Sequence, residues 1–139
     1  ISQKGNLFIT LFFRLDQKKI NFRQFAILNA FLLKKIISEK ISKKIKIKWP
    51  NDLTYNNLKF CGILQETIKF NQLDFLIVGV GLNTNLAPLN KGFKSTCLKN
   101  IIKKKINNQK LLRNILITYN KFLGETKKLS FSELKKKYR

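Results

Sequence analysis

The apolar positions of the chain repeat with two different periods, and the change of period predicts both strands and helices. Residues 22–37 carry apolar side chains three and four positions apart, which predicts an amphipathic helix that Asn21 could cap. Residues 7–15 are apolar almost throughout, which is typical of a strand buried on both faces. Lysine and isoleucine alternate over residues 43–48, which predicts a half-buried strand that stops at Pro50.

Two turns predict further strands, and two more helices follow them. Asn56-Asn57 is typical of a hairpin turn, because asparagine tolerates positive φ. Residues 58–69 and 73–82 then read as strands joined by a turn near Asn71-Gln72. Residues 112–123 have the period of an amphipathic helix, and Ser130 with Glu133 fits a capping box that opens a last helix. Consecutive strands between helices predict one α+β domain over residues 1–139, with a mixed, largely antiparallel sheet.

The charge is large and has two interpretations. The 139 residues include 29 Lys or Arg against 7 Asp or Glu, a formal charge of +22. Such a surface favours polyanions, so a basic nucleic-acid-binding module is one candidate. However, Lys, Asn, Ile and Phe make up 69 residues, and their AT-rich codons could produce the same charge through genome composition. With only four arginines, the chain is also poor in the forked donor that reads bases and phosphates.

Several classes of site are excluded or disfavoured by the residue types that are scarce. Histidine is absent, which excludes Ser-His and Cys-His nucleophiles. Cys61 and Cys97 are too few for a four-cysteine zinc site and do not suggest a disulfide framework, which favours a reducing, cytoplasmic location. The longest apolar run, residues 75–82, is far shorter than the roughly 20 residues of a membrane span. Because the chain starts at Ile1 and contains no methionine, we expect an internal fragment.

Three strings carry candidate chemistry. The first, Lys48-Trp49-Pro50-Asn51-Asp52, lies where a predicted strand ends, and its scarce carboxylate could accept hydrogen bonds from an amine. The alternative is that Asp52 only caps local backbone in an Asx-turn. The second, Lys59-Phe60-Cys61-Gly62, puts a lysine near a strand glycine that allows close approach of a ligand. The alternative is an ordinary solvated lysine, since lysine is abundant in this chain.

The third string is Val78-Gly79-Val80-Gly81-Leu82-Asn83. It is not a dinucleotide fingerprint, because position 84 is Thr84 rather than glycine. Gly79 and Gly81 lie two positions apart in a predicted strand, so both open the same face and could accommodate a flat ligand. The alternative is a packed sheet surface with a β-bulge.

Together and in this order, the three strings resemble one family: the catalytic domain of biotin protein ligase, also called biotin–acetyl-CoA-carboxylase ligase. Lys4-Gly-Asn-Leu7 and Ser95-Thr-Cys-Leu98 resemble two further segments of that family, with Cys97 at a position usually occupied by serine. The resemblance runs from about Gly5 to the end. It implies the class II synthetase-like fold of biotin and lipoate ligases, incomplete at both ends, with the N-terminal part and the small C-terminal β-barrel absent.

The resemblance also implies a reaction. Biotin and ATP, with Mg²⁺, would give biotinyl-5′-adenylate. A lysine of the biotin carboxyl carrier domain of acetyl-CoA carboxylase would then take the biotinyl group. Lys59 would stand near the biotin carboxylate and the α-phosphate, and Asp52 would face the adenylate and the incoming lysine. Contacts to biotin or the adenylate would come from the same strings. Cys61 would form part of the pocket wall, and no residue of the chain would bind a metal ion. These binding residues would be Lys59, Gly62, Gly79, Gly81, Asn83, Trp49 and Asn51.

The family's Gly-Arg-rich loop over the adenylate, and its upstream Ser-Thr segment, have no counterpart in the sequence. We therefore expect this fragment alone to be inactive. A DNA-binding role would require a helix-turn-helix before Ile1. The alternatives that stay open are a lipoate ligase of the same fold, a basic nucleic-acid-binding module, and a non-catalytic relic of the ligase fold.

Overall fold

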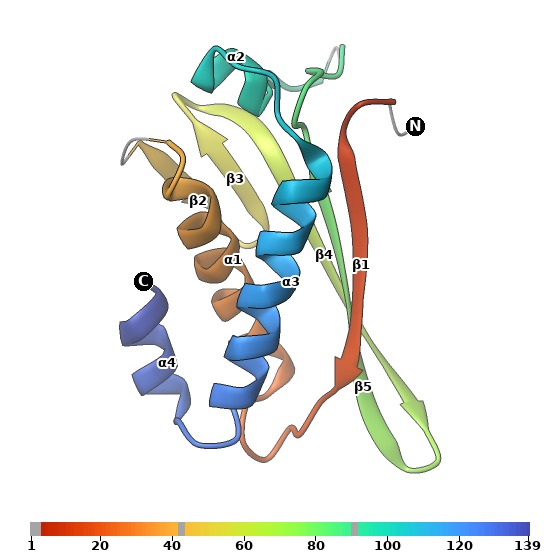
Figure 1. Ribbon diagram of the computed structural model, residues 1–139. Coiled ribbons are helices and arrows are strands. Elements are labelled where there is room, and N and C mark those ends of the chain that lie inside the picture. Colours follow the sequence, from red (N-terminus) through yellow and green to blue (C-terminus); the bar gives the residue numbers. More distant parts are fainter. Residues whose placement is uncertain (1–3, 42–43, 90–91) are drawn as a thin grey trace.

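The computed structural model describes residues 4–41, 44–89 and 92–139 as a curved antiparallel sheet with helices on one face (Figure 1). The sheet order is β1-β5-β4-β3-β2, and every ladder between these strands is antiparallel. The parallel component is an isolated bridge between Lys59 and Ser95. The predicted α+β class is therefore confirmed. The elements in chain order are β1 (Leu7–Arg14), α1 (Phe22–Ser38), β2 (Ile45–Lys48), β3 (Asp52–Tyr55), β4 (Leu58–Phe70), β5 (Leu73–Leu82), α2 (Leu98–Ile102), α3 (Asn108–Glu125) and α4 (Phe131–Tyr138).

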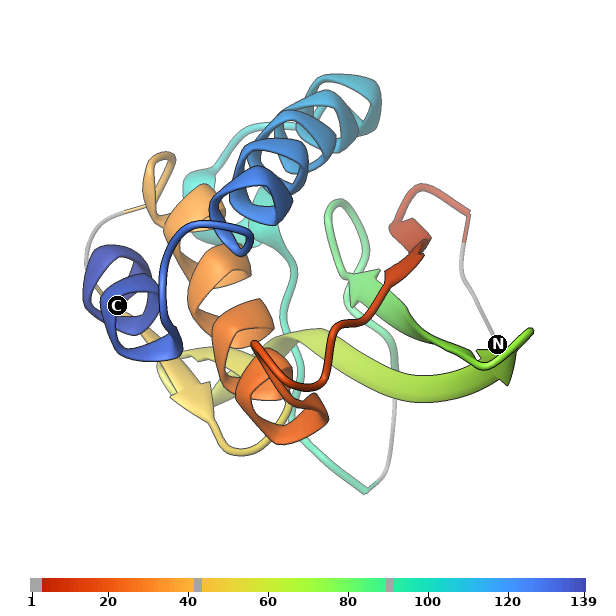
Figure 2. The ribbon, with the colours of Figure 1, turned by 90° about the horizontal axis from the view of Figure 1, so that it is seen from below.

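Helix α1 is the centre of the core. Leu28, Leu32 and Leu33 are fully buried, and α3 and α4 pack beside α1 on the same side of the sheet (Figure 2). Asn21 caps α1 through a capping box with Gln24, as its position before the apolar repeat predicts. The Asn56-Asn57 and Asn71-Gln72 turns are also confirmed, since all four residues have positive φ.

A buried polar chain ties three elements together. The Tyr119 hydroxyl of α3 donates to Asn29 Oδ1 of α1 at 3.0 Å, and Asn29 Nδ2 donates to Gln65 Oε1 of β4 at 2.7 Å. Gln65 Nε2 in turn donates to the Phe22 carbonyl oxygen at 2.7 Å. Burial raises the pKa of Tyr119, so its hydroxyl remains a donor. This chain fixes how α1 and α3 sit against β4, the strand that carries Lys59.

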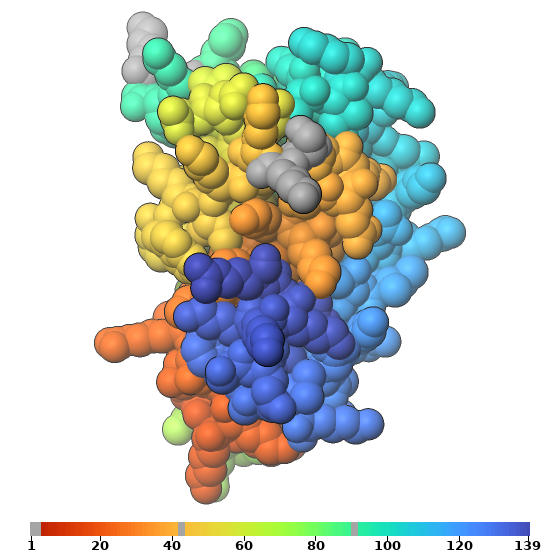
Figure 3. Space-filling view, turned by 90° about the vertical axis from the view of Figure 1, so that its left-hand side faces the viewer, coloured from red at the N-terminus to blue at the C-terminus, as the bar shows by residue number. Residues whose placement is uncertain are grey.

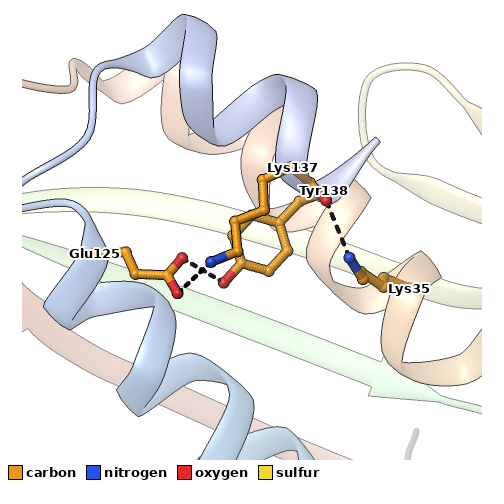
Figure 4. Close-up of polar contacts among 4 residues, drawn as sticks. All are labelled: Lys35, Glu125, Lys137 and Tyr138. Atoms are coloured by element: carbon orange, nitrogen blue, oxygen red, sulfur yellow. Dashed lines mark hydrogen bonds and ion pairs between the residues drawn. The ribbon is translucent and has the colours of Figure 1, made fainter.

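The C-terminal helix is held by a second polar cluster (Figure 4). Glu125 at the end of α3 accepts from Lys137 Nζ and from the Tyr138 hydroxyl, each at 2.7 Å. Lys35 Nζ of α1 donates to the Lys137 carbonyl oxygen at 3.0 Å. The predicted capping box at Ser130 is present, with Leu134 fully buried beneath it. Helix α4 is therefore anchored at both of its ends.

Some expectations from the sequence were wrong or incomplete. Strand β1 is not buried on both faces: Phe8 and Phe12 are 48% and 58% exposed, because the helices cover only the opposite face. Leu116, in the predicted apolar stripe of α3, is 48% exposed. Strand β2 begins at Ile45, and position 43 of the predicted strand lies outside the described residues. Short elements β3 and α2 were not predicted. Within the described ranges, no helix has both the length and the apolar character needed to cross a membrane.

Candidate functional site

A cavity of about 470 Å³ lies on the outward face of the sheet, opposite the helical layer. It is lined from β1, β4 and β5, and from the start of β3. Six residues singled out from the sequence line it: Asn51, Asp52, Lys59, Gly62, Gly79 and Gly81. The three separate strings thus converge in space. They converge because antiparallel pairing puts Gly62 opposite both Asp52 of β3 and Gly81 of β5.

A β-bulge turns Lys59 toward this cavity. Strict alternation would put residues 59 and 62 on opposite faces of β4, since they are three positions apart. The register between β3 and β4 shifts by one residue, so that Asp52 pairs with Gly62 whereas Thr54 pairs with Lys59. The extra residue is Phe60, which is fully buried. As a result, Lys59 and Gly62 share the outward face.

Lys59 and Asp52 form an ion pair within the cavity. Lys59 Nζ lies 2.8 Å from Asp52 Oδ1, and the two side chains are 34% and 20% exposed. The amine remains accessible from solvent, so an incoming anion can share it with the carboxylate. The cavity therefore offers a cation for a carboxylate or phosphate next to a carboxylate that can accept from an amine.

The glycines form the floor of the cavity. A Cβ at Gly62 would lie 3.4 Å from Lys59 Nζ, and a Cβ at Gly81 would lie 3.3 Å from the Phe8 ring. At Gly79 the nearest neighbour would be Leu64 Cβ at 3.8 Å. The absence of side chains at these positions leaves a flat strip of backbone bordered by Phe8 and Leu64. Such a strip suits a flat, mostly apolar ligand whose acidic end reaches Lys59.

Phe93 is a contact of the site that the sequence did not reveal. Lys59 Nζ lies 5.5 Å from the Phe93 ring centroid, in a cation–π arrangement. The Phe93 segment is held to β4 by backbone bonds, from Lys59 N to the Lys94 carbonyl and from Thr96 N to the Lys59 carbonyl. With twelve phenylalanines in the chain, composition gave no reason to select this one.

Two predicted site residues lie outside the cavity lining. Trp49 packs edge-on against Phe31 of α1, with ring centroids 5.9 Å apart, and is 52% exposed in a different groove. Asn83 follows β5, and its Nδ2 donates to the Thr96 carbonyl at 3.2 Å. Asn83 therefore holds the segment that runs alongside Lys59 instead of facing the floor.

Cys61 is part of the wall behind the ion pair. Burial raises the pKa of this thiol, the Asp52 charge raises it further, and the Lys59 charge opposes both. The thiol is therefore protonated at neutral pH, which disfavours it as a nucleophile.

The comparison with known proteins decides the family. The model of the Biotin/lipoate A/B protein ligase family matches residues 1–83, more than half of the chain. The chain belongs to this family. The match includes β1 to β5, and so all the strands that line the cavity.

Individual relatives agree with this assignment. The bifunctional ligase/repressor BirA of Bacillus subtilis (strain 168) is 29% identical over 126 residues, covering 86% of this chain and 39% of that protein. Biotin–protein ligase 2 of Arabidopsis thaliana is 48% identical over 61 residues, covering 42% of this chain and 16% of that protein. The structure of biotin protein ligase from Aquifex aeolicus in complex with biotin and ATP superimposes with a TM-score of 0.80 at 29% identity, covering 99% of this chain and 58% of that one. The chain thus spans between 16% and 58% of the length of these relatives.

Proposed function

We propose that the chain is the central part of a biotin protein ligase. In this proposal, biotin and ATP form biotinyl-5′-adenylate and pyrophosphate, and a lysine of a biotin carboxyl carrier domain then takes the biotinyl group as an amide. The observation that carries the proposal is the Lys59–Asp52 pair at one end of a glycine floor, in a member of the family. The missing N-terminal part and C-terminal β-barrel belong to the same proposal.

Each residue then has a physical role. A carboxylate is a poor acyl donor, and adenylation supplies a leaving group. The Lys59 cation reduces the repulsion between the biotin carboxylate and the α-phosphate and stabilises charge that develops at phosphorus. Asp52 orients the carrier lysine and assists its deprotonation. Gly62, Gly79 and Gly81 admit the flat ring system of biotin. Asn51 borders the same cavity, and Asn83 supports the adenine side by holding the Thr96 segment. The position of Trp49 outside the cavity does not favour the adenylate contact expected of it from the sequence.

The charge of the cavity bears on how ATP binds. Lys59 and Asp52 neutralise one another, so the triphosphate needs further positive charge. The described residues contain no group of three or more His, Cys, Asp or Glu that could hold a metal ion. In this proposal Mg²⁺ therefore arrives as the ATP complex, and a loop outside residues 1–139 supplies additional cations. For this reason we expect residues 1–139 alone to be inactive.

The same framework proposes a cellular context. The carrier domain of acetyl-CoA carboxylase is the partner, and the cytoplasm is the location, which the free thiols Cys61 and Cys97 support. Recognition of DNA would need a helix-turn-helix outside the described chain. A lipoate ligase is the second candidate, because the matching family includes both ligase types.

The test is a transfer assay with the complete gene product and with residues 1–139. Each is incubated with ATP, Mg²⁺, an apo carrier domain, and either biotin or lipoate. Biotin transfer by the complete protein, and none by residues 1–139, is expected. Robust transfer by the isolated chain would refute the need for the outer loop. Transfer of lipoate but not biotin would make the second candidate the correct one.

A further inference from the structure

A groove of about 550 Å³ lies beside the turn formed by residues 49–51, which precedes Asp52, and is separate from the cavity. Its floor is apolar and is formed by Ile27 and Phe31 of α1 and Ile47 and Trp49 of the β2–β3 hairpin. Figure 3 shows this side of the molecule, with α4 beside the residues of α1 and the hairpin. Phe31 on the floor of the groove also belongs to the core.

The charged residues that line this groove are all cationic. They are Lys34 of α1, Lys46 of β2, and Lys135 and Arg139 at the C-terminal helix. No acidic residue lines the groove among the described residues. An apolar floor inside a cationic rim is complementary to an acidic segment that also carries an apolar anchor.

The groove adjoins the site through a very short connection. Lys48 of β2 and Asp52 of β3 are partners in the ladder, and residues 49–51 form the turn between them. Trp49 faces the groove, whereas Asn51 and Asp52 face the cavity. A macromolecule seated against Trp49 therefore comes within three residues of the carboxylate that we propose to receive the carrier lysine.

We propose that this groove, lined by Phe31, Trp49, Lys34 and Lys46, docks an acidic face of the carrier domain and so positions its lysine for transfer. The inference rests on the proposed function and extends it to recognition of the protein substrate. The half-exposed Trp49, backed edge-on by Phe31, is the apolar anchor point, and the lysines favour approach of the acidic face.

The occupant is more consistent with a protein than with a nucleic acid. Nucleic-acid grooves pair cations with exposed aromatic faces along an extended track. Here, within the described part of the chain, the floor has only two aromatic residues, Phe31 and Trp49, and Phe31 is 7% exposed. Among the described residues that line the groove, their edge-on contact leaves Trp49 as the one aromatic face open for stacking.

The test compares two double variants in the complete protein. The first, Lys34→Glu with Lys46→Glu, reverses the charge of two of the four cations on the groove rim. The second, Lys110→Glu with Lys128→Glu, makes the same change in net charge at exposed positions on α3 and after it. Adenylate formation is followed by biotin-dependent pyrophosphate release, and transfer is followed with increasing carrier concentration. A stability measurement confirms that each variant is folded.

The groove variant is expected to raise the KM for the carrier about tenfold, with weaker dependence on salt, and to leave pyrophosphate release within about twofold of the native rate. The control variant should change neither. Equal KM values for the two variants would overturn the inference while the proposed function stands. Competition by duplex DNA that disappears only in the groove variant, with the carrier KM unchanged, would assign the groove to nucleic acid. Absence of pyrophosphate release in the native protein would refute the proposed function, and this inference with it.

Discussion

Gly62 of β4 and Gly81 of β5 are direct partners in the antiparallel ladder, so two adjacent positions of the outward face carry no side chain. On one side of the pair is the Lys59 amine, and on the other is the Phe8 ring. A sheet gains nothing in stability from such a pair, because glycine lowers strand stability and offers no surface to pack. In the proposed function, this open strip is the room for the ligand.

Gly79→Val tests this strip directly. A Cβ at position 79 has only ordinary contacts, the nearest with Leu64 Cβ at 3.8 Å, so the backbone there accommodates a side chain. Because valine favours strands, we expect thermal stability to be kept or raised, by up to about 1 kcal/mol. The affinity for biotin should fall at least about tenfold, since the side chain occupies the floor; one tenfold step corresponds to about 1.4 kcal/mol. Calorimetric titration with biotin and a melting curve give the two values.

The control is Glu66→Val, on the same face of β4 beyond the cavity. Equal biotin affinities in the two variants would show that Gly79 does not form part of the biotin site.

Lys59→Ala is expected to slow adenylate formation about 10²–10³-fold, by analogy with the loss of one preorganised donor at a site of developing negative charge. Stability should change by no more than about 1 kcal/mol, because the Lys59–Asp52 pair is partly exposed. Lys69→Ala removes the same charge from an exposed position on the same strand. Biotin-dependent pyrophosphate release measures both. If the two variants lose activity equally, net charge and not a specific contact draws ATP to the protein.

Asp52→Asn separates the second half-reaction from the first. It keeps the shape of the side chain and removes the negative charge that would accept from the carrier lysine. Transfer from preformed biotinyl-adenylate should slow by at least about tenfold, within the range that general-base groups contribute. Single-turnover transfer to the carrier domain is the measurement. Asp74→Asn, which alters a carboxylate that accepts from Gln17 at 2.9 Å, should behave like the native protein.

The anchoring of α4 should weaken in acid. Burial opposes ionisation of Glu125, but hydrogen bonds from Lys137 and Tyr138 outweigh it and hold the pKa of this carboxyl below its ordinary value of 4.5. Its stabilisation is therefore complete above pH 4.5 and is lost as the pH falls through the lower folded-state value. Glu125→Gln should lower the free energy of unfolding by about 1–2 kcal/mol at pH 7. Denaturant titrations should show this difference shrinking at lower pH. The control Glu39→Gln, at an exposed site after α1, should leave the free energy of unfolding at pH 7 unchanged.

Duplex DNA should bind the chain weakly and without sequence preference, if the charge of +22 reflects composition. The affinity should fall steeply as salt rises, because lysine–phosphate contacts release counterions. Fluorescence anisotropy at two salt concentrations with two unrelated sequences provides the measurement. A sequence-selective complex at physiological salt would favour the nucleic-acid interpretation.

The repeat of apolar residues predicted the long helices and strands, because an element with one buried face has the same apolar period in any fold. It could not show which face of β1 would be covered. Phe8 and Phe12 are as apolar as Leu7, and only the position of the helical layer makes them outward-facing. Strand β3 escaped notice because its four residues lie between a proline turn and an Asn-Asn turn. Likewise, α2 has five residues and no side-chain cap.

The site was predictable to the extent that it lies in contiguous strings. Asp52, Lys59 and the three glycines came from such strings, and antiparallel pairing brings them together. The string containing Trp49 indicated a turn after Pro50, but it could not reveal that Trp49 faces the groove while Asn51 and Asp52 face the cavity. Nor could it reveal the bulge at Phe60, since a bulge depends on the partner strand.

The helices cover one face of the sheet, and the cavity occupies the other. Core residues such as Leu28 and Leu32 are therefore separated by a layer of backbone from the residues that line the cavity. Substitutions on the outward face can accumulate without repacking the interior. A scaffold of this kind can change what binds to its outward face while its folding remains nearly unchanged.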